Sequence, residues 1–422
     1  MQKDGYDNRI TTASARAAEA YAHATSVMLA GQSGMVEAFD AVTREDPGFA
    51  LGWMGLGRAH HALGQGAAAL AALERAEALS SGTTDREASH INAFGLLLRG
   101  QGPQAYRAIR AHTDAWPRDA LVAQTCSSVF GLIGFSGKPG REAEILAFTA
   151  GLLPHYGADW WMTSQYAFAL CETGNIEKAD QMIDRSLAQK PENAHGVHVR
   201  SHIWYEAGAT DQGLTYLNSW LQGYENDGIL YSHLYWHAAL WSLAQGDTEG
   251  MWTRVDAAVA PASGSASPAI NILTDTVSIL HRATLAGVAV DDGRWQAVSA
   301  YARQAFPATG NAFVDVHAAL AHAMAGDAPA LEQIITAPAG PAADLVPDLA
   351  AGYRSMAAGD WSEASGSMMR AMADLARIGG SRAQRDMVEQ SLLTCLVRAG
   401  RAQEARDIAA LRRPLLSSSI PA

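Results

Sequence analysis

The stretch Pro47–Leu79, PGFALGWMGLGRAHHALGQGAAALAALERAEAL, decides the fold of this 422-residue chain. It consists of two Ala-rich apolar runs that meet at a glycine-containing turn, the pattern of two helices in a hairpin. Bulky and small residues recur in it at fixed intervals, at Trp53, Leu56, Gly57, His60, Ala69, Leu73 and Ala76. The stretch therefore predicts a helical hairpin with small residues where the helices cross closely.

The same spacing returns along the chain, and it is that of the tetratricopeptide repeat, which has about 34 residues. Later frames are centred on the glycines Gly100, Gly174, Gly208, Gly246, Gly326, Gly359 and Gly400. Pro117 and Pro191 follow second helices, where proline prevents continuation. The predicted fold is all-α, a right-handed α-solenoid of about nine or ten tetratricopeptide-like hairpins. We expect residues 1–422 to form one domain, with residues 1–12 and 413–422 loosely ordered.

Composition narrows the classes of function. The chain has 31 basic and 43 acidic residues, a net charge of −12, and no stripe of Lys or Arg, so nucleic acid is excluded as a partner. No run approaches the ~18 apolar residues of a membrane span. The N-terminus lacks the apolar core of a signal peptide, which predicts a cytoplasmic location.

Three cysteines, Cys126, Cys171 and Cys395, lie far apart in apolar helical stretches. An odd, scattered set does not suggest a disulfide framework. We expect all three to be buried and unpaired. The chain also lacks a phosphate-binding glycine loop, a nucleophile elbow and a His-Glu-Xaa-Xaa-His motif, so no familiar catalytic signature applies.

Two segments carry histidines spaced i, i+4. AHGVHVRSHIWYE holds His198 and His202, and YSHLYWHAALW holds His233 and His237. On a helix this spacing places both imidazoles on one face. The repeat frame assigns both pairs to successive first helices, which line the concave side of such arrays. The four rings are therefore expected to converge, as ligands of a metal such as zinc or as acid and base groups.

A third first helix, NAFVDVHAALAHAMAG, places Asp315 and His317 in comparable positions. Trp236 and Tyr205 are candidate aromatic walls of the same site, together with Trp204, Trp220, Tyr231 and Tyr235. Single histidines more often make structural hydrogen bonds. We assign that role to His60, His61, His90, His112, His155, His281 and His322.

These segments resemble the tetratricopeptide repeat protein 38 family over nearly the whole chain. The resemblance is carried by the two histidine pairs, the SHLYWHAALW block, and three further blocks with polar residues at set places: DTVSILHR with Asp275 and Arg282, FVDVH with Asp315 and His317, and GGSRAQRD with Arg385 and Asp386. It implies a cytoplasmic α-solenoid without an assigned activity. In the family pattern an acidic residue stands three positions after the second histidine, where this chain has Tyr205, and Glu206 is displaced by one.

Two functions follow from these patterns. In the first, the concave face binds a small molecule or metal, with a hydrolase or lyase activity carried by His198, His202, His233, His237 and His317. Substrate would then contact Trp236, Tyr205, Asp275, Arg282, Asp315, Arg385 and Asp386. In the second, the array is a scaffold that binds a peptide of a protein partner in its groove. Structural bonding or capping is the alternative for Arg282, Arg385 and Asp386.

Overall fold

The computed structural model describes residues 1–412, and nearly all of its regular structure is helical. Two short strands precede the helices, β1 (Gln2–Lys3) and β2 (Arg9–Ile10). The α-helices are α1 (Ala15–Leu29), α2 (Met35–Glu45), α3 (Ala50–Ala62), α4 (Gly66–Ala78), α5 (Asp85–Leu98), α6 (Gly102–Ala115), α7 (Ala120–Gln124), α8 (Arg141–Tyr156), α9 (Trp160–Glu172), α10 (Ile176–Gln189), α11 (Ala194–Ala207), α12 (Thr210–Trp220), α13 (Tyr231–Ala244), α14 (Thr248–Arg254), α15 (Ala269–Leu285), α16 (Asp292–Ala305), α17 (Ala312–Ala325), α18 (Ala328–Thr336), α19 (Val346–Ala357), α20 (Trp361–Met372), α21 (Arg382–Arg398) and α22 (Ala402–Arg412). Short 3₁₀ segments and one π turn, Val255–Val259, join or extend them.

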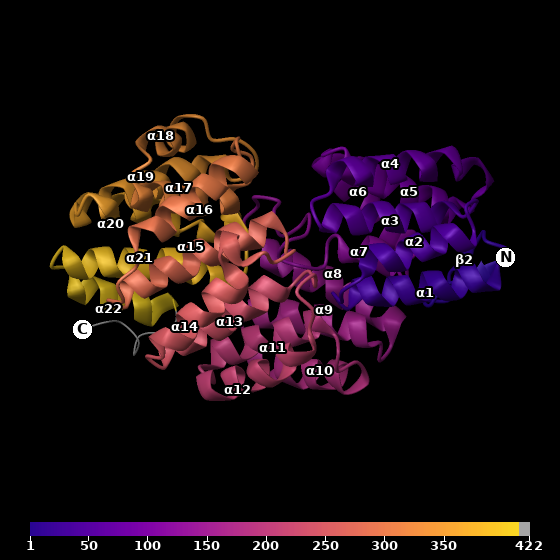
Figure 1. Ribbon diagram of the computed structural model, residues 1–422, viewed down its shortest axis with the longest axis horizontal. Helices are drawn as coiled ribbons and strands as arrows, with labels where there is room; N and C mark the ends of the chain where they lie inside the picture. The colour runs from indigo at the N-terminus through magenta and orange to yellow at the C-terminus, as the bar shows by residue number, and fades with distance from the viewer. Residues whose placement is uncertain (413–422) are drawn as a thin grey trace.

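Consecutive helices pair into hairpins, which confirms the predicted all-α solenoid. Ten such pairs pack within the described chain: α1 with α2, α3 with α4, α5 with α6, and every odd-numbered helix from α9 to α21 with its successor. The first helices stack on one another from α9 through α11, α13, α15, α17 and α19. Figure 1 shows the array running from the N-terminus at one end of the longest axis, through α9 to α13, to α20 and α22 at the other.

The glycines of the repeat frame lie at the turns inside these hairpins. Gly174 between α9 and α10 has φ +82°, and Gly208 between α11 and α12 has φ +68°. Residues with a Cβ rarely adopt such values, and a left-handed glycine ends a helix by satisfying its last carbonyl groups. Gly287 makes the same turn between α15 and α16 with φ +78°, although the sequence frame did not include it.

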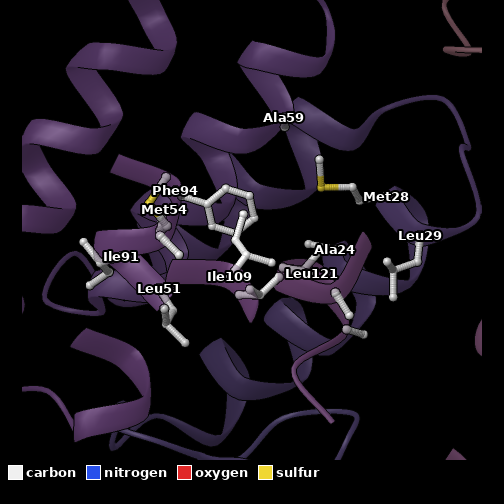
Figure 2. Close-up of a cluster of buried hydrophobic side chains, with 14 of the residues drawn as sticks. Ala24, Met28, Leu29, Leu51, Met54, Ala59, Ile91, Phe94, Ile109 and Leu121 are labelled. Atoms are coloured by element: carbon white, nitrogen blue, oxygen red, sulfur yellow. The ribbon is translucent and has the colours of Figure 1, made fainter. Parts of the chain in front are cut away.

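Apolar side chains of the first helices fill the space between successive hairpins. In the N-terminal part the core takes Ala24, Met28 and Leu29 from α1, Leu51, Met54 and Ala59 from α3, Ile91 and Phe94 from α5, and Ile109 and Leu121 from α6 and α7 (Figure 2). All of these are nearly or fully buried. Their removal from water is the main stabilising contribution to the stack.

The first twelve residues differ from the expectation of loose order. Strands β1 and β2 pair in antiparallel fashion, and Ile10 is fully buried. Arg86 donates to the backbone oxygen of Arg9, and Arg118 donates to that of Tyr6. The segment is tied down because its backbone oxygens serve as acceptors for two arginines of later repeats. Residues 413–422 lie outside the described part of the chain.

Helix α21 folds back against earlier repeats. Arg141 of α8, fully buried, donates to the backbone oxygens of Ala376 and Gly380, which precede α21. Arg385 pairs with Glu142 and also reaches the oxygen of Gly380. Helix α21 also packs on α15 and α11 (Figure 1). The inner side of the stack is therefore covered here by the chain itself.

Two further expectations are met in the described residues. Cys126, Cys171 and Cys395 are buried and form no disulfide. None of the helices between residues 1 and 412 combines the length and apolar character needed to cross a bilayer.

Candidate metal centre

The four paired histidines meet in one place. His198 and His202 come from α11, and His233 and His237 come from α13, two first helices that pack side by side. One ligand nitrogen from each ring lies within 4.8 Å of all the others. The predicted convergence is confirmed, because i, i+4 spacing puts each pair on one helix face and the hairpin repeat turns both faces inward.

Burial isolates this four-histidine group from solvent. The residues are 9% (His198), 1% (His202), 3% (His233) and 0% (His237) exposed. Burial lowers the pKa of His198, His202 and His237 well below the usual value, and the neighbouring imidazoles lower it further. These three rings are therefore neutral near pH 7 and keep a lone pair for a metal ion.

The group has fewer hydrogen bonds than its burial calls for. His202 Nε2 and His198 Nε2 share one hydrogen bond at 2.8 Å. His202 Nδ1 and both nitrogens of His237 have no hydrogen-bond partner among the described residues. A buried polar atom without a partner costs about 1–3 kcal/mol, so such atoms indicate a missing ligand or solvent.

His233 is held on two sides. Its Nδ1 lies 2.8 Å from Asp275 Oδ2 on α15, and the indole of Trp236 stacks on its ring at a centroid distance of 5.0 Å and an angle of 16°. Asp275 is 1% exposed. Burial raises the pKa of Asp275, while His233, Asn271 and Gln384 beside it act in the opposite direction. Phe168 of α9 packs against His198 and His202.

His317 lies outside the four-histidine group. Its Nδ1 donates to the backbone oxygen of Phe313 at 2.7 Å, and burial lowers the pKa of its ring to about 4. Asp315 accepts from the backbone N–H of Gly310 at 3.1 Å, and burial raises its pKa to about 6. Both residues serve the start of α17, so their predicted part in the same site has no support in this geometry.

The other predicted substrate contacts bind protein groups. Arg282 on α15 donates to Ser278 Oγ, to the hydroxyl of Tyr205 and to the backbone oxygen of Ala383. Tyr205 in turn donates to Asp386 on α21 at 2.9 Å. Together with Arg385, these residues form the contact between α21 and the earlier repeats. The sequence left two roles open for Arg282, Arg385 and Asp386, substrate binding or structural bonding between hairpins. The structure shows structural bonding between hairpins.

A second cluster, His90, His112 and Asp119, also has the spacing of a metal site and was not predicted. The polar side chains of this cluster already form hydrogen bonds within the protein. Asp119 Oδ2 accepts from His90 Nδ1 at 2.9 Å, from His112 Nε2 at 3.2 Å and from the buried Arg86. His112 Nδ1 pairs with Ser89 Oγ. The guanidinium fills the place at the carboxylate that a cation would take, so this cluster is a completed ionic network.

The sequence carries no periodic signal for the second cluster. His90 lies on the first helix and His112 on the second helix of one hairpin, and Asp119 caps the next helix. In the sequence, His112 lies 22 positions after His90, and Asp119 lies 29 positions after it. No fixed spacing on a single helix marks it, and each histidine taken alone indicated only structural hydrogen bonding.

Comparison with known proteins adds little to this geometry. No protein-family model matches the chain. Three solved structures show a likeness. Yeast Tom70 is 13% identical over 95% of this chain and 84% of its own, with a TM-score of 0.35. The TPR domain of P58(IPK) is 14% identical over 92% of this chain and 100% of its own, with a TM-score of 0.22, and Naa15/Naa10 bound to HypK-THB is 14% identical over 94% of this chain and 68% of its own, with a TM-score of 0.25. Values this low carry no function over to this chain. Its own hairpins and turn glycines make it a tetratricopeptide-like helical-repeat protein.

Proposed function

We propose that this protein binds one divalent transition-metal ion, zinc or an ion of similar preference, through His198, His202, His233 and His237. The observation that supports this most directly is His237, which is fully buried with both ring nitrogens unpartnered among the described residues. Imidazole nitrogens suit Zn²⁺, Cu²⁺, Ni²⁺ and iron, and four of them complete a tetrahedral shell.

The spacing of the rings fits such a shell after small movements. Metal–nitrogen bonds of 2.0–2.1 Å place tetrahedral ligand atoms about 3.3 Å apart. The ligand nitrogens lie within 4.8 Å of one another, and the Nε2 atoms of His198 and His202 are 2.8 Å apart. Shifts of under about 1 Å per ring complete the site. His198 is the most exposed of the four.

A four-histidine shell leaves no tetrahedral position for a substrate, whereas catalytic zinc sites keep one open. The proposed property is therefore metal binding, without hydrolase or lyase turnover. A peptide in contact with these rings does not agree with their burial. A protein partner bound elsewhere on the array stays a prediction. The cytoplasmic location also stays a prediction, and three buried cysteines that form no disulfide accord with it.

Metal analysis tests the proposal. Protein purified without a His tag, incubated with Zn²⁺ and dialysed, is expected to hold one zinc per chain by elemental analysis. The double variant His202→Ala/His237→Ala should hold none. The matched control His90→Ala/His112→Ala removes two buried histidines of the completed network and should still hold one. Wild-type protein without zinc, or equal zinc in the two double variants, would overturn the proposal.

A further inference from the structure

Among the described residues, Asp275 is the carboxylate that forms a hydrogen bond with a ring of the four-histidine group. It lies on α15, and its Oδ2 is 2.8 Å from His233 Nδ1. His198 and His202 bond to each other, and His237 has no hydrogen-bond partner in the part of the chain that the structure describes. Only one of the four rings is therefore oriented by an anion.

This contact decides which nitrogen of His233 is available. A carboxylate accepts hydrogen bonds, so this contact holds a proton on His233 Nδ1 and leaves Nε2 as the nitrogen that can bind a metal ion. The stacked Trp236 fixes the ring plane, and Asp275 fixes the rotation within that plane. His233 thus presents Nε2 in a set direction before any ion arrives, whereas no carboxylate in residues 1–412 forms a hydrogen bond with any of the other three rings.

Asp275 also has two amide side chains as neighbours. Asn271, one turn earlier on α15, lies beside it, as does Gln384 of α21. Gln384 is part of the capping box that starts α21, where its Oε1 accepts from the backbone N–H of Ser381 at 2.9 Å. The carboxylate therefore lies between the histidines of α13 and the start of α21.

Charge gives a second reason for a carboxylate at this place. A divalent ion bound by four neutral rings brings two positive charges into a site from which water is excluded, and Arg282 lies near His237. A buried cation needs an anion close by. Asp275, at 1% exposure, is the carboxyl group that lies directly behind a ligand, 2.8 Å from His233 Nδ1.

We infer that Asp275 is a positioning residue for the metal site, holding His233 with Nε2 toward the ion and strengthening that ring as a ligand. The inference rests on the proposed function. Partners of this kind behind a histidine ligand typically contribute 10–100-fold in metal affinity.

Affinity measurements on the full chain test it. Metal-free protein is titrated with Zn²⁺ against a chromophoric chelator, for wild type, Asp275→Asn and Asp275→Ala. Asn keeps the shape and an accepting oxygen but removes the charge, so we expect about 10-fold weaker binding, with about 100-fold for Ala. The matched control Asp315→Asn changes another buried carboxylate, which bonds only backbone, and should leave the affinity unchanged.

A spectroscopic readout separates positioning from general loosening of the fold. Co²⁺ loaded into the site gives ligand-field bands that depend on ligand geometry. The bands should move in Asp275→Asn and stay in place in Asp315→Asn. Equal zinc affinity and equal bands in wild type and Asp275→Asn would overturn the inference and leave the proposed function standing. No zinc binding by wild type would overturn both.

Discussion

Tyr205 on α11 donates its hydroxyl hydrogen bond to Asp386 on α21 at 2.9 Å, although 181 residues separate them in the sequence. The same oxygen accepts from Arg282 at 3.0 Å. One phenol thus links three first helices that are not all neighbours in the stack.

Tyr205→Phe should lower the free energy of unfolding by about 1–2 kcal/mol, because it removes a partner from two largely buried charged groups. Urea unfolding followed by circular dichroism measures the change. Tyr301→Phe is the control, since its hydroxyl makes no hydrogen bond within residues 1–412 and should change stability by under about 0.5 kcal/mol. Equal effects of the two variants would contradict this account of the contact.

Gly380→Ala tests the tight packing before α21. Gly380 has φ +72°, and a Cβ there would meet Phe313 Cε2 at 2.3 Å. Gly246 has a similar φ of +75°, with open space where its Cβ would be. Both variants should lose about 1 kcal/mol to backbone strain, and Gly380→Ala about 1–3 kcal/mol more to overpacking. Equal denaturant midpoints would show that Phe313 moves aside freely.

Glu172 predicts a pH dependence. Burial raises its pKa from 4.5 to about 7, with Arg385 acting in the opposite direction. The folded state therefore keeps this proton up to about pH 7, while the unfolded chain releases it near 4.5, so this group lowers stability as pH rises through that window.

Glu172→Gln carries no such proton. Its unfolding free energy should match that of wild type near pH 4.5 and exceed it by up to about 3 kcal/mol at pH 8. Chemical denaturation at several pH values gives the difference directly. The exposed Glu249→Gln is the control and should show a difference that does not vary with pH. A flat difference for Glu172→Gln as well would contradict the prediction.

Removal of metal should lower thermal stability. An ion that binds only the folded chain stabilises it by about 2.7 kcal/mol at a free concentration 100 times its dissociation constant. Thermal unfolding with Zn²⁺ and with a strong chelator should therefore differ by several degrees in wild type. In His202→Ala/His237→Ala the two curves should coincide; a zinc-dependent shift that persists there would place the ion elsewhere.

The fold could be predicted because the repeat is local. Gly174 and Gly208 mark hairpin turns by their spacing alone, and the i, i+4 histidines share a face by helix geometry. The contacts that complete the site are long-range instead. Asp275 meets His233 across 42 residues, and Arg141 meets Gly380 across 239. No period in the sequence encodes them, since they depend on how far the whole array curves.

Because long-range contacts cannot be predicted from the sequence, substrate binding was one of the two roles predicted for Arg282, Arg385 and Asp386. Polar residues within apolar blocks indicate either a ligand or a buried partner, and the sequence does not separate the two. The structure supplies partners for all three. For His237 it supplies none among the described residues, and this contrast limits the candidate site to the four imidazoles that the sequence already placed at its centre.

The return of α21 onto α8 and α11 has a consequence for how this protein unfolds. In an open repeat array each unit contacts only its neighbours, so the ends fray and the transition spreads along the chain one unit at a time. Here Arg141 and Arg385 join units that are far apart in order, and the final repeats cannot detach without breaking contacts in the middle. We expect hydrogen exchange at α9, α11 and α21 to rise together in one cooperative step.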